Sequence, residues 1–126
     1  MARILVIDDQ PLIRDLFREA LEHDGHHVTV AADGYEGVQS YHDTCPDLVM
    51  VDLQMPGLDG FETIRQLRTM GDVPIIAMSG GGESDHGANV LEIALHLGAV
   101  RTFEKPVRLN DLVTLVRDVL SQYGAR

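Results

Sequence analysis

The fold is first indicated by residues 4–9, where the sequence is Ile4-Leu5-Val6-Ile7-Asp8-Asp9. Four consecutive apolar residues without alternation are typical of a parallel strand buried on both faces. Pro11, which suits the first turn of a helix, follows at once, and apolar residues recur at helical spacing from 12 to 21. The stretch therefore predicts a central strand that ends in two carboxylates and leads into a helix.

The same alternation continues along the rest of the chain. Apolar runs predict further strands at 27–31, 48–51, 73–78 and 100–103, and helical periodicity predicts helices within 34–41, 61–67, 90–97 and 109–120. Five βα units indicate an α/β fold with helices on both faces of a parallel sheet. We expect a (βα)5 doubly wound sheet with the flavodoxin-like strand order 2-1-3-4-5.

Length and composition restrict the class of protein. A chain of 126 residues that is 44% hydrophobic fits one domain over 1–126, with no output domain attached. The single cysteine, Cys45, excludes an internal disulfide and favours a reducing, cytoplasmic environment. The longest apolar run, 73–78, is far shorter than the ~20 residues of a membrane span, and Ile4–Ile7 is too short for a signal peptide.

The charge balance indicates which partners to expect. Ten basic residues against 20 acidic residues give a formal net charge of −10, which also helps solubility. A direct nucleic-acid binder normally has a basic footprint, and an acidic surface repels phosphate backbones and anionic membranes. We therefore expect protein or cation partners, with no direct nucleic-acid contact and no membrane contact.

Three carboxylates follow two strands that are neighbours in the expected order. Asp8 and Asp9 end the first strand and Asp52 ends the third. Ligands bind at the carboxyl ends of the strands in such sheets, so these side chains should converge. Like charges in one crevice raise pKa values unless a cation lies among them, and carboxylate oxygens suit Mg²⁺.

Two further polar residues follow the remaining strands of this edge. Ser79 ends the fourth strand, and Lys105, after the fifth, is long enough to reach the carboxylates. Taken singly, Asp9 could be only a cap of the first helix, Ser79 a loop hydroxyl and Lys105 a solvated lysine. Their occurrence together at four strand ends favours a functional site.

The ordered set of motifs resembles the receiver domain of response regulators. The matching stretches are residues 4–9, residues 46–52 (Pro46-Asp47-Leu48-Val49-Met50-Val51-Asp52), residues 55–60 (Met55-Pro56-Gly57-Leu58-Asp59-Gly60) and Lys105-Pro106. The likeness covers the whole chain and is to a stand-alone, chemotaxis-regulator-like single-domain response regulator. It implies a signalling module of a two-component system or phosphorelay rather than a turnover enzyme.

The resemblance also implies a role for each site residue. Asp52 lies at the position of the phosphoryl acceptor, which attacks a phosphohistidine of a sensor histidine kinase or histidine phosphotransfer protein. Lys105 and Ser79 would hold phosphoryl oxygens, and the Lys105–Pro106 bond is expected to be cis. Phosphorylation would change binding to a downstream protein, with the protein a monomer or a phosphorylation-dependent dimer.

The metal ligands implied by the resemblance are oxygen atoms only. Asp9 and Asp52 would bind Mg²⁺ directly, together with the backbone carbonyl of Gln54, and Asp8 would act through water. The metal would neutralise charge on the transferring phosphoryl group. The side chain of Gln54 should overlook the phosphoryl site.

The sequence departs from the family pattern in two places. Thr102 stands where the family has an aromatic residue on the fifth strand, and strand alternation directs Phe103 to the other face, into the core. The Gly-rich segment Gly80–Gly87 is longer than usual for the family. We expect it to become ordered when Ser79 contacts a phosphoryl group, replacing part of the aromatic switch.

Other functions and sites fit the sequence less well. A Mg²⁺-dependent phosphatase or phosphotransferase with an aspartyl nucleophile is the main alternative, but Gln54 offers no general acid. A flavodoxin-type cofactor site would place Asp8 and Asp9 against a phosphate, and a degenerate receiver would not keep the complete set. His23, His26 and His27 are expected in a solvated turn rather than in a metal site.

Overall fold

The computed structural model of the chain describes residues 1–55, 59–80 and 87–123. Strands and helices alternate along it: β1 Arg3–Ile7, α1 Pro11–His23, β2 His27–Ala31, α2 Gly34–Thr44, β3 Leu48–Asp52, α3 Gly60–Met70, β4 Ile75–Ser79, α4 Gly87–Leu97, β5 Arg101–Glu104 and α5 Leu109–Tyr123. The strands pair in parallel in the order β2-β1-β3-β4-β5. The predicted α/β fold and strand order are confirmed.

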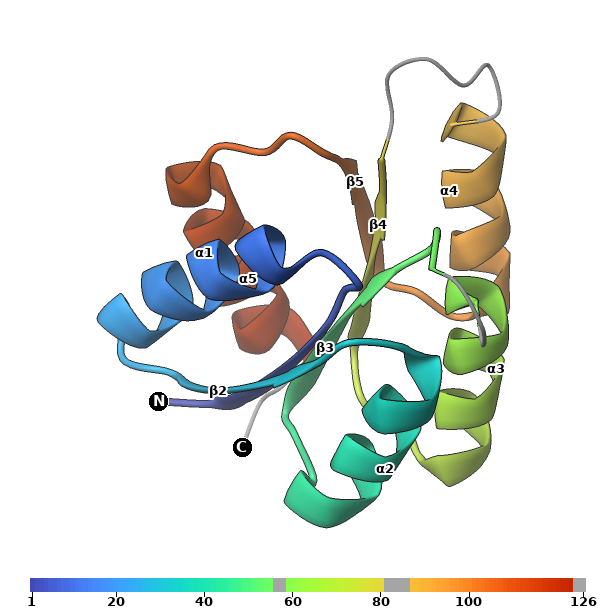
Figure 1. Cartoon of the computed structure of the whole chain (residues 1–126), viewed down its shortest axis with the longest axis horizontal. Coiled ribbons are helices and arrows are strands. Elements are labelled where there is room, and N and C mark those ends of the chain that lie inside the picture. Colours follow the sequence, from blue (N-terminus) through green and yellow to red (C-terminus); the bar gives the residue numbers. More distant parts are fainter. Residues whose placement is uncertain (56–58, 81–86, 124–126) are drawn as a thin grey trace.

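The sheet lies between two layers of helices. Figure 1 shows α1 and α5 over one face and α2, α3 and α4 over the other. Residues of β1 alternate between the layers: Leu5 and Ile7 pack with the α3 residues Ile64 and Leu67, whereas residues 4 and 6 pack with Phe17 and Leu21 of α1 or with α5. Both faces of the central strands are therefore buried, as the unbroken apolar runs predict.

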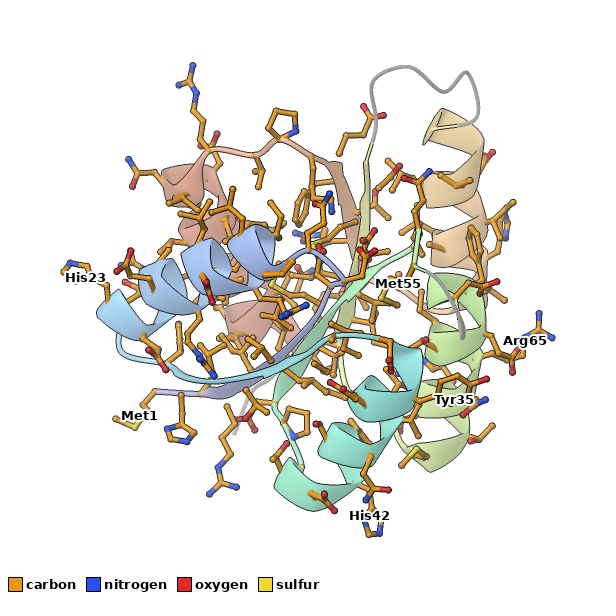
Figure 2. All side chains as sticks on the ribbon, viewed as in Figure 1. Met1, His23, Tyr35, His42, Met55 and Arg65 are labelled. Atoms are coloured by element: carbon orange, nitrogen blue, oxygen red, sulfur yellow. The ribbon has the colours of Figure 1, made fainter. Side chains whose placement is uncertain are left out.

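Several polar side chains of the helices lie on the outer surface. The labelled side chains of His23, His42 and Arg65 point away from the sheet, while Met55 is buried near its carboxyl edge (Figure 2). No helix in the described ranges is both long enough and apolar enough to span a membrane.

The helices α1 and α3 begin with different kinds of N-cap. The N-cap of α1 is Gln10, without a side-chain cap, and Pro11 takes the first helical position. The simpler interpretation of Asp9 as the cap of this helix is therefore wrong. At α3, the Asp59 carboxylate accepts a hydrogen bond of 2.9 Å from the backbone N–H of Glu62, which satisfies an otherwise unpaired donor.

Element boundaries differ from the sequence-based ranges at the fourth strand. That strand begins at Ile75 rather than at Val73, because Pro74 has no N–H to donate to a neighbouring strand. Its last residue is Ser79, as expected. Residues 56–58 of the loop after β3, and residues 81–86 of the Gly-rich segment, lie outside the described residues.

The turn between α1 and β2 is not simply solvated. His23 and His27 are exposed, but the His26 side chain is only 8% exposed, and its Nδ1 accepts a hydrogen bond of 3.2 Å from the backbone N–H of Ala2. Its Nε2 lies 3.5 Å from Asp24, which also accepts hydrogen bonds from Arg117 of α5. The expectation of a wholly solvated turn was wrong for His26, because its side chain is largely buried and accepts a hydrogen bond from the N-terminal segment.

Candidate functional site

Three carboxylates meet at the carboxyl edge of the sheet. One carboxylate oxygen from each of Asp8, Asp9 and Asp52 lies within 4.8 Å of the others. Asp52 is the last residue of β3, and Asp8 and Asp9 follow β1, its direct neighbour. Asp8 is fully buried and Asp52 is 2% exposed, whereas Asp9 is half-buried. The predicted convergence is confirmed.

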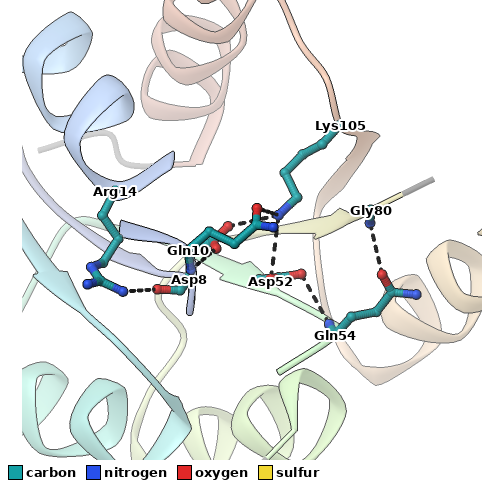
Figure 3. Close-up of polar contacts among 7 residues, drawn as sticks. All are labelled: Asp8, Gln10, Arg14, Asp52, Gln54, Gly80 and Lys105. Carbon is teal, nitrogen blue, oxygen red and sulfur yellow. Dashed lines mark hydrogen bonds and ion pairs between the residues drawn. The ribbon is translucent and has the colours of Figure 1, made fainter. Parts of the chain in front are cut away.

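Lys105 reaches the same cluster from the end of β5. Its Nζ lies 3.0 Å from Asp8 Oδ2 and 3.5 Å from Asp52 Oδ2, and the side chain is only 10% exposed (Figure 3). The Lys105–Pro106 peptide bond is cis, as expected. The interpretation of Lys105 as a solvated lysine is therefore wrong: its ammonium partly neutralises the buried carboxylates.

Ser79 lies at the adjoining strand end. It is fully buried as the last residue of β4, and its backbone carbonyl accepts a hydrogen bond of 2.8 Å from the N–H of Lys105. This bond ties the end of β4 to the segment that carries the lysine. The structure thus places a hydroxyl, an ammonium and three carboxylates at one edge of the sheet.

Burial controls the ionisation of Asp52. The pKa of Asp52 is raised from 3.8 to about 6, mainly by loss of solvent. The N–H of Gln54, 3.1 Å from Asp52 Oδ1, and the charge of Lys105 lower this pKa, whereas the charge of Asp8 raises it. The single ammonium does not offset burial and two neighbouring carboxylates. The site has excess negative charge in oxygen donors, which suits a hard divalent cation such as Mg²⁺.

A cavity of about 340 Å³ opens beside these carboxylates. Its lining includes Asp9, Asp52, Gln54, Gly80 and Lys105. Space, oxygen ligands and a fixed cation therefore occur together, and this arrangement can hold a metal ion and an anionic group next to Asp52. The backbone carbonyl of Gln54 as a metal ligand stays a prediction.

Glycine permits the close approach of α3 to this edge. A Cβ on Gly60 would lie 2.3 Å from the backbone oxygen of Asp52 and 2.4 Å from the Cα of Leu53. Real side chains do not make such contacts with backbone atoms, so only glycine fits at this helix start. Gly60 therefore allows the start of α3 to lie directly against the end of β3.

Three contacts at the site were not predicted from the sequence. Gln10 Oε1 lies 3.4 Å from Lys105 Nζ, and the guanidinium of Arg14 donates a hydrogen bond of 2.8 Å to the backbone oxygen of Asp8. The side chain of Gln54 accepts a hydrogen bond of 3.2 Å from the N–H of Gly80 (Figure 3). The position of Arg14, four residues after Gln10 on a helix that starts at the site, is the signal that could have indicated its contact.

Two adjacent residues of β5, Thr102 and Phe103, have different surroundings. The Phe103 ring packs against that of Phe17, with centroids 6.3 Å apart, among the core residues under α1 and α5. The prediction that Phe103 belongs to the core is confirmed. Thr102 is half-buried one residue earlier, where strand alternation places it on the opposite face.

Comparisons with known proteins agree with this geometry. Residues 4–117 match the family model described as the response regulator receiver domain. The chain is 34% identical over 121 residues to the transcriptional regulatory protein CseB of Streptomyces coelicolor, which covers 96% of this chain and 50% of that protein. It is 35% identical over 119 residues to the response regulator MprA of a Mycobacterium species, which covers 94% and 50%.

The curated relatives are longer than this chain. The chain spans about half the length of the curated relatives that it matches. CseB is named a transcriptional regulatory protein, so this likeness gives no support to the expectation that direct nucleic-acid contact is absent.

A solved structure gives the same fold over nearly the whole chain. The CheY-like response regulator receiver domain protein of Methanospirillum hungatei superposes with a TM-score of 0.88 at 26% identity, covering 98% of this chain and 96% of that one. In this family, phosphorylation of an aspartate is the general mechanism, and the acidic pocket generally binds Mg²⁺. The sequence match, the fold and the acidic edge agree: the chain belongs to the family of response regulator receiver domains.

Proposed function

We propose that Asp52 is the phosphoryl acceptor of this receiver domain. The observation that carries the proposal is the position of its carboxylate: 2% exposed, 3.5 Å from the ammonium of Lys105, and within 4.8 Å of oxygens from Asp8 and Asp9. Burial raises the pKa of Asp52 only to about 6, so the carboxylate is mostly ionised at neutral pH, as a nucleophile must be.

The reaction is a phosphoryl transfer from a phosphohistidine. An oxygen of Asp52 attacks the phosphorus, the P–N bond breaks, and its electron pair returns to the imidazole of the donor. The product is an acyl phosphate on Asp52, which water later hydrolyses. The domain thus promotes its own phosphorylation and dephosphorylation and is not a turnover enzyme.

Two side chains would then hold the phosphoryl group. The Lys105 ammonium already lies beside Asp52 and supplies a charge-assisted hydrogen bond to a phosphoryl oxygen. The Ser79 hydroxyl, at the end of the neighbouring strand, supplies a second donor. Removal of Lys105 should therefore impair the transfer more than it impairs folding.

The acidic residues would hold Mg²⁺. Asp9, Asp52 and the backbone carbonyl of Gln54 supply direct ligands, and Asp8 acts through water. When bound, the metal neutralises charge on the transferring phosphoryl group. The excess of carboxylates over the single ammonium of Lys105 at this edge supports this assignment.

The partners follow from the reaction. The donor is a sensor histidine kinase or a histidine phosphotransfer protein of a two-component system or phosphorelay in the cytoplasm, and the phosphorylated state alters binding to a target protein. A phosphatase acting on external substrates is less well supported. Gln54, two residues beyond Asp52, is a neutral amide engaged with Gly80 and offers no general acid.

The experiment that tests the assignment is chemical mapping of the acyl phosphate. The protein is incubated with a small phosphodonor and Mg²⁺, reduced with borohydride, digested and analysed by mass spectrometry. We expect reduction to homoserine at position 52 only. Modification at Asp8 or Asp9 instead, or no modification of a protein that also binds neither Mg²⁺ nor beryllofluoride, would overturn the proposal.

A further inference from the structure

One side chain bridges the two loops on either side of the Asp52 cavity. Gln54 lies two residues after the end of β3, and Gly80 directly follows β4. The side-chain carbonyl Oε1 of Gln54 accepts a hydrogen bond of 3.2 Å from the backbone N–H of Gly80 (Figure 3). Both residues are exposed and both line the cavity that also contains Asp52 and Lys105. The bond therefore crosses the rim of the candidate phosphoryl site.

The donor in this bond is one that an anion in the cavity would use. A phosphoryl group on Asp52 would bring negatively charged oxygens into a space where N–H donors lower their energy. The N–H of Gln54 already donates to Asp52 and the ammonium of Lys105 to Asp8, whereas the N–H of Gly80 is taken by Gln54 Oε1. A phosphoryl oxygen and the Gln54 carbonyl would compete for this one donor, and their partial charges repel each other.

We propose that Gln54 is a positioning residue that restrains the phosphoryl site in the unphosphorylated protein. Its side-chain carbonyl occupies the N–H of Gly80 and must release it before that N–H can bind a phosphoryl oxygen. This inference rests on the proposed phosphorylation of Asp52 and adds a determinant of how readily the phosphorylated state forms. The competent state is the one in which the Gln54–Gly80 bond is open.

The size of the effect follows from the strength of one hydrogen bond. A neutral bond of this kind shifts an equilibrium by about twofold to tenfold. If only a fraction of the molecules is open, the apparent dissociation constant is the intrinsic one divided by that fraction. Breaking the bond should therefore tighten binding of a phosphoryl analogue by about two- to tenfold, and no more.

The chain offers two independent ways to break this bond. Gln54→Ala removes the acceptor. Gly80→Ala keeps both the N–H and the glutamine, but its added Cβ would lie 2.7 Å from Gln54 Oε1 and must push that flexible group away. The Gly80 backbone does not require a positive φ, so alanine fits there without strain.

The two substitutions should not be additive. Apart from the Gln54 side chain, no heavy atom of the described residues beyond the two chain neighbours lies within 4 Å of the Cβ added at position 80. In the Gln54→Ala background the new methyl group therefore has no described side chain left to displace and should have no further effect. A double-mutant cycle isolates this coupling from any separate effect of either change.

The measurement is the affinity of the full chain for beryllofluoride, a phosphoryl analogue, followed by fluorine NMR in saturating Mg²⁺. We expect both single variants to bind about two- to tenfold more tightly than wild type, and the double variant to equal Gln54→Ala. Gln39→Ala, which removes an exposed glutamine hydrogen bond on α2, is the matched control and should leave the affinity unchanged. Mg²⁺ affinity without beryllofluoride should also be unchanged in Gln39→Ala, which lies outside the site.

The outcomes separate the two proposals. If wild type binds beryllofluoride but the single variants bind equally well or more weakly, or if the effects add in the double variant, the role of Gln54 is overturned and the phosphorylation proposal stands. If wild type binds no beryllofluoride and forms no acyl phosphate, the proposed function fails and the inference fails with it. Should Gln54→Ala not fold, Gly80→Ala alone provides the test.

Discussion

Asp52→Asn should stabilise the metal-free protein at neutral pH. In the folded state, burial and the charges of Asp8 and Asp9 raise the pKa of Asp52 from 3.8 to about 6. Ionising this carboxyl group is therefore harder in the folded chain than in the unfolded chain, so the charge reduces stability above both pKa values. Asparagine has a similar shape and no charge, and it removes this cost.

The magnitude follows from the size of the pKa change. A rise of about 2 units, at about 1.4 kcal/mol per unit, corresponds to about 3 kcal/mol. The amide loses the charge-assisted contacts with Lys105 and with the N–H of Gln54, which reduces the net gain. We expect Asp52→Asn to increase the free energy of unfolding by about 1–3 kcal/mol at pH 7.5.

The pH dependence identifies the cause. Between pH 3.8 and about 6 the folded protein binds more protons at Asp52 than the unfolded chain does, so this group lowers stability as the pH rises through that window. The advantage of the variant should therefore be full at pH 7.5 and nearly absent at pH 4. Titrating groups that do not interact with Asp52 are common to both proteins and cancel in the difference.

The assay is urea unfolding followed by far-UV circular dichroism, in chelator, at pH 7.5 and pH 4. Saturating Mg²⁺ at pH 7.5 should stabilise wild type more than the variant and narrow the difference in stability, since a ligand of the folded state adds more stability the more tightly it binds. Two results would refute this reasoning: a variant that is no more stable than wild type at pH 7.5, or a variant whose stability advantage over wild type is as large at pH 4 as at pH 7.5.

Three further predictions concern other groups. Lys105→Ala should tighten Mg²⁺ binding by about 1–2 kcal/mol, measured by calorimetry, because an ammonium 3.0 Å from Asp8 repels the metal; weaker binding would contradict this. Gly60→Ala should lower the free energy of unfolding by about 2 kcal/mol or more, because its methyl group would overlap the backbone of Asp52; an unfolding midpoint equal to wild type in urea would count against it. Burial, the N-terminus and Arg117 lower the pKa of His26, and the charge of Asp24 raises it only in part. His26 therefore binds protons better in the unfolded chain, so the free energy of unfolding should fall as the pH drops through 6.5. In an Asp52→Asn background, His26→Gln should flatten this slope in thermal unfolding, and an unchanged slope would exclude His26 as its cause.

The sequence predicted the features that depend on topology. Apolar runs with helical segments between them were enough for the strand order, and the strand order brings Asp8, Asp9 and Asp52 together because neighbouring parallel strands end at the same edge. Strand alternation also placed Phe103 in the core beside Phe17.

The features that the sequence did not predict depend on side-chain contacts between distant segments. His26 accepts a hydrogen bond from Ala2, and Asp24 beside it accepts hydrogen bonds from Arg117 of α5; both partners are remote in sequence. The Gln54–Gly80 bond joins two loops 26 residues apart, and no local pattern marks a glutamine as the partner of a backbone N–H. The N-cap of α1 is Gln10 rather than Asp9, because the Asp9 carboxylate lies with those of Asp8 and Asp52 at the sheet edge.

The central claim, that this domain accepts a phosphoryl group on Asp52, is tested most directly by intact mass after incubation with a small phosphodonor and Mg²⁺. The account predicts the added mass of one phosphoryl group on wild type, and none on Asp52→Asn or on wild type in chelator. The same adduct on Asp52→Asn, or a wild-type protein that gains no phosphoryl group and binds neither Mg²⁺ nor beryllofluoride, would contradict it.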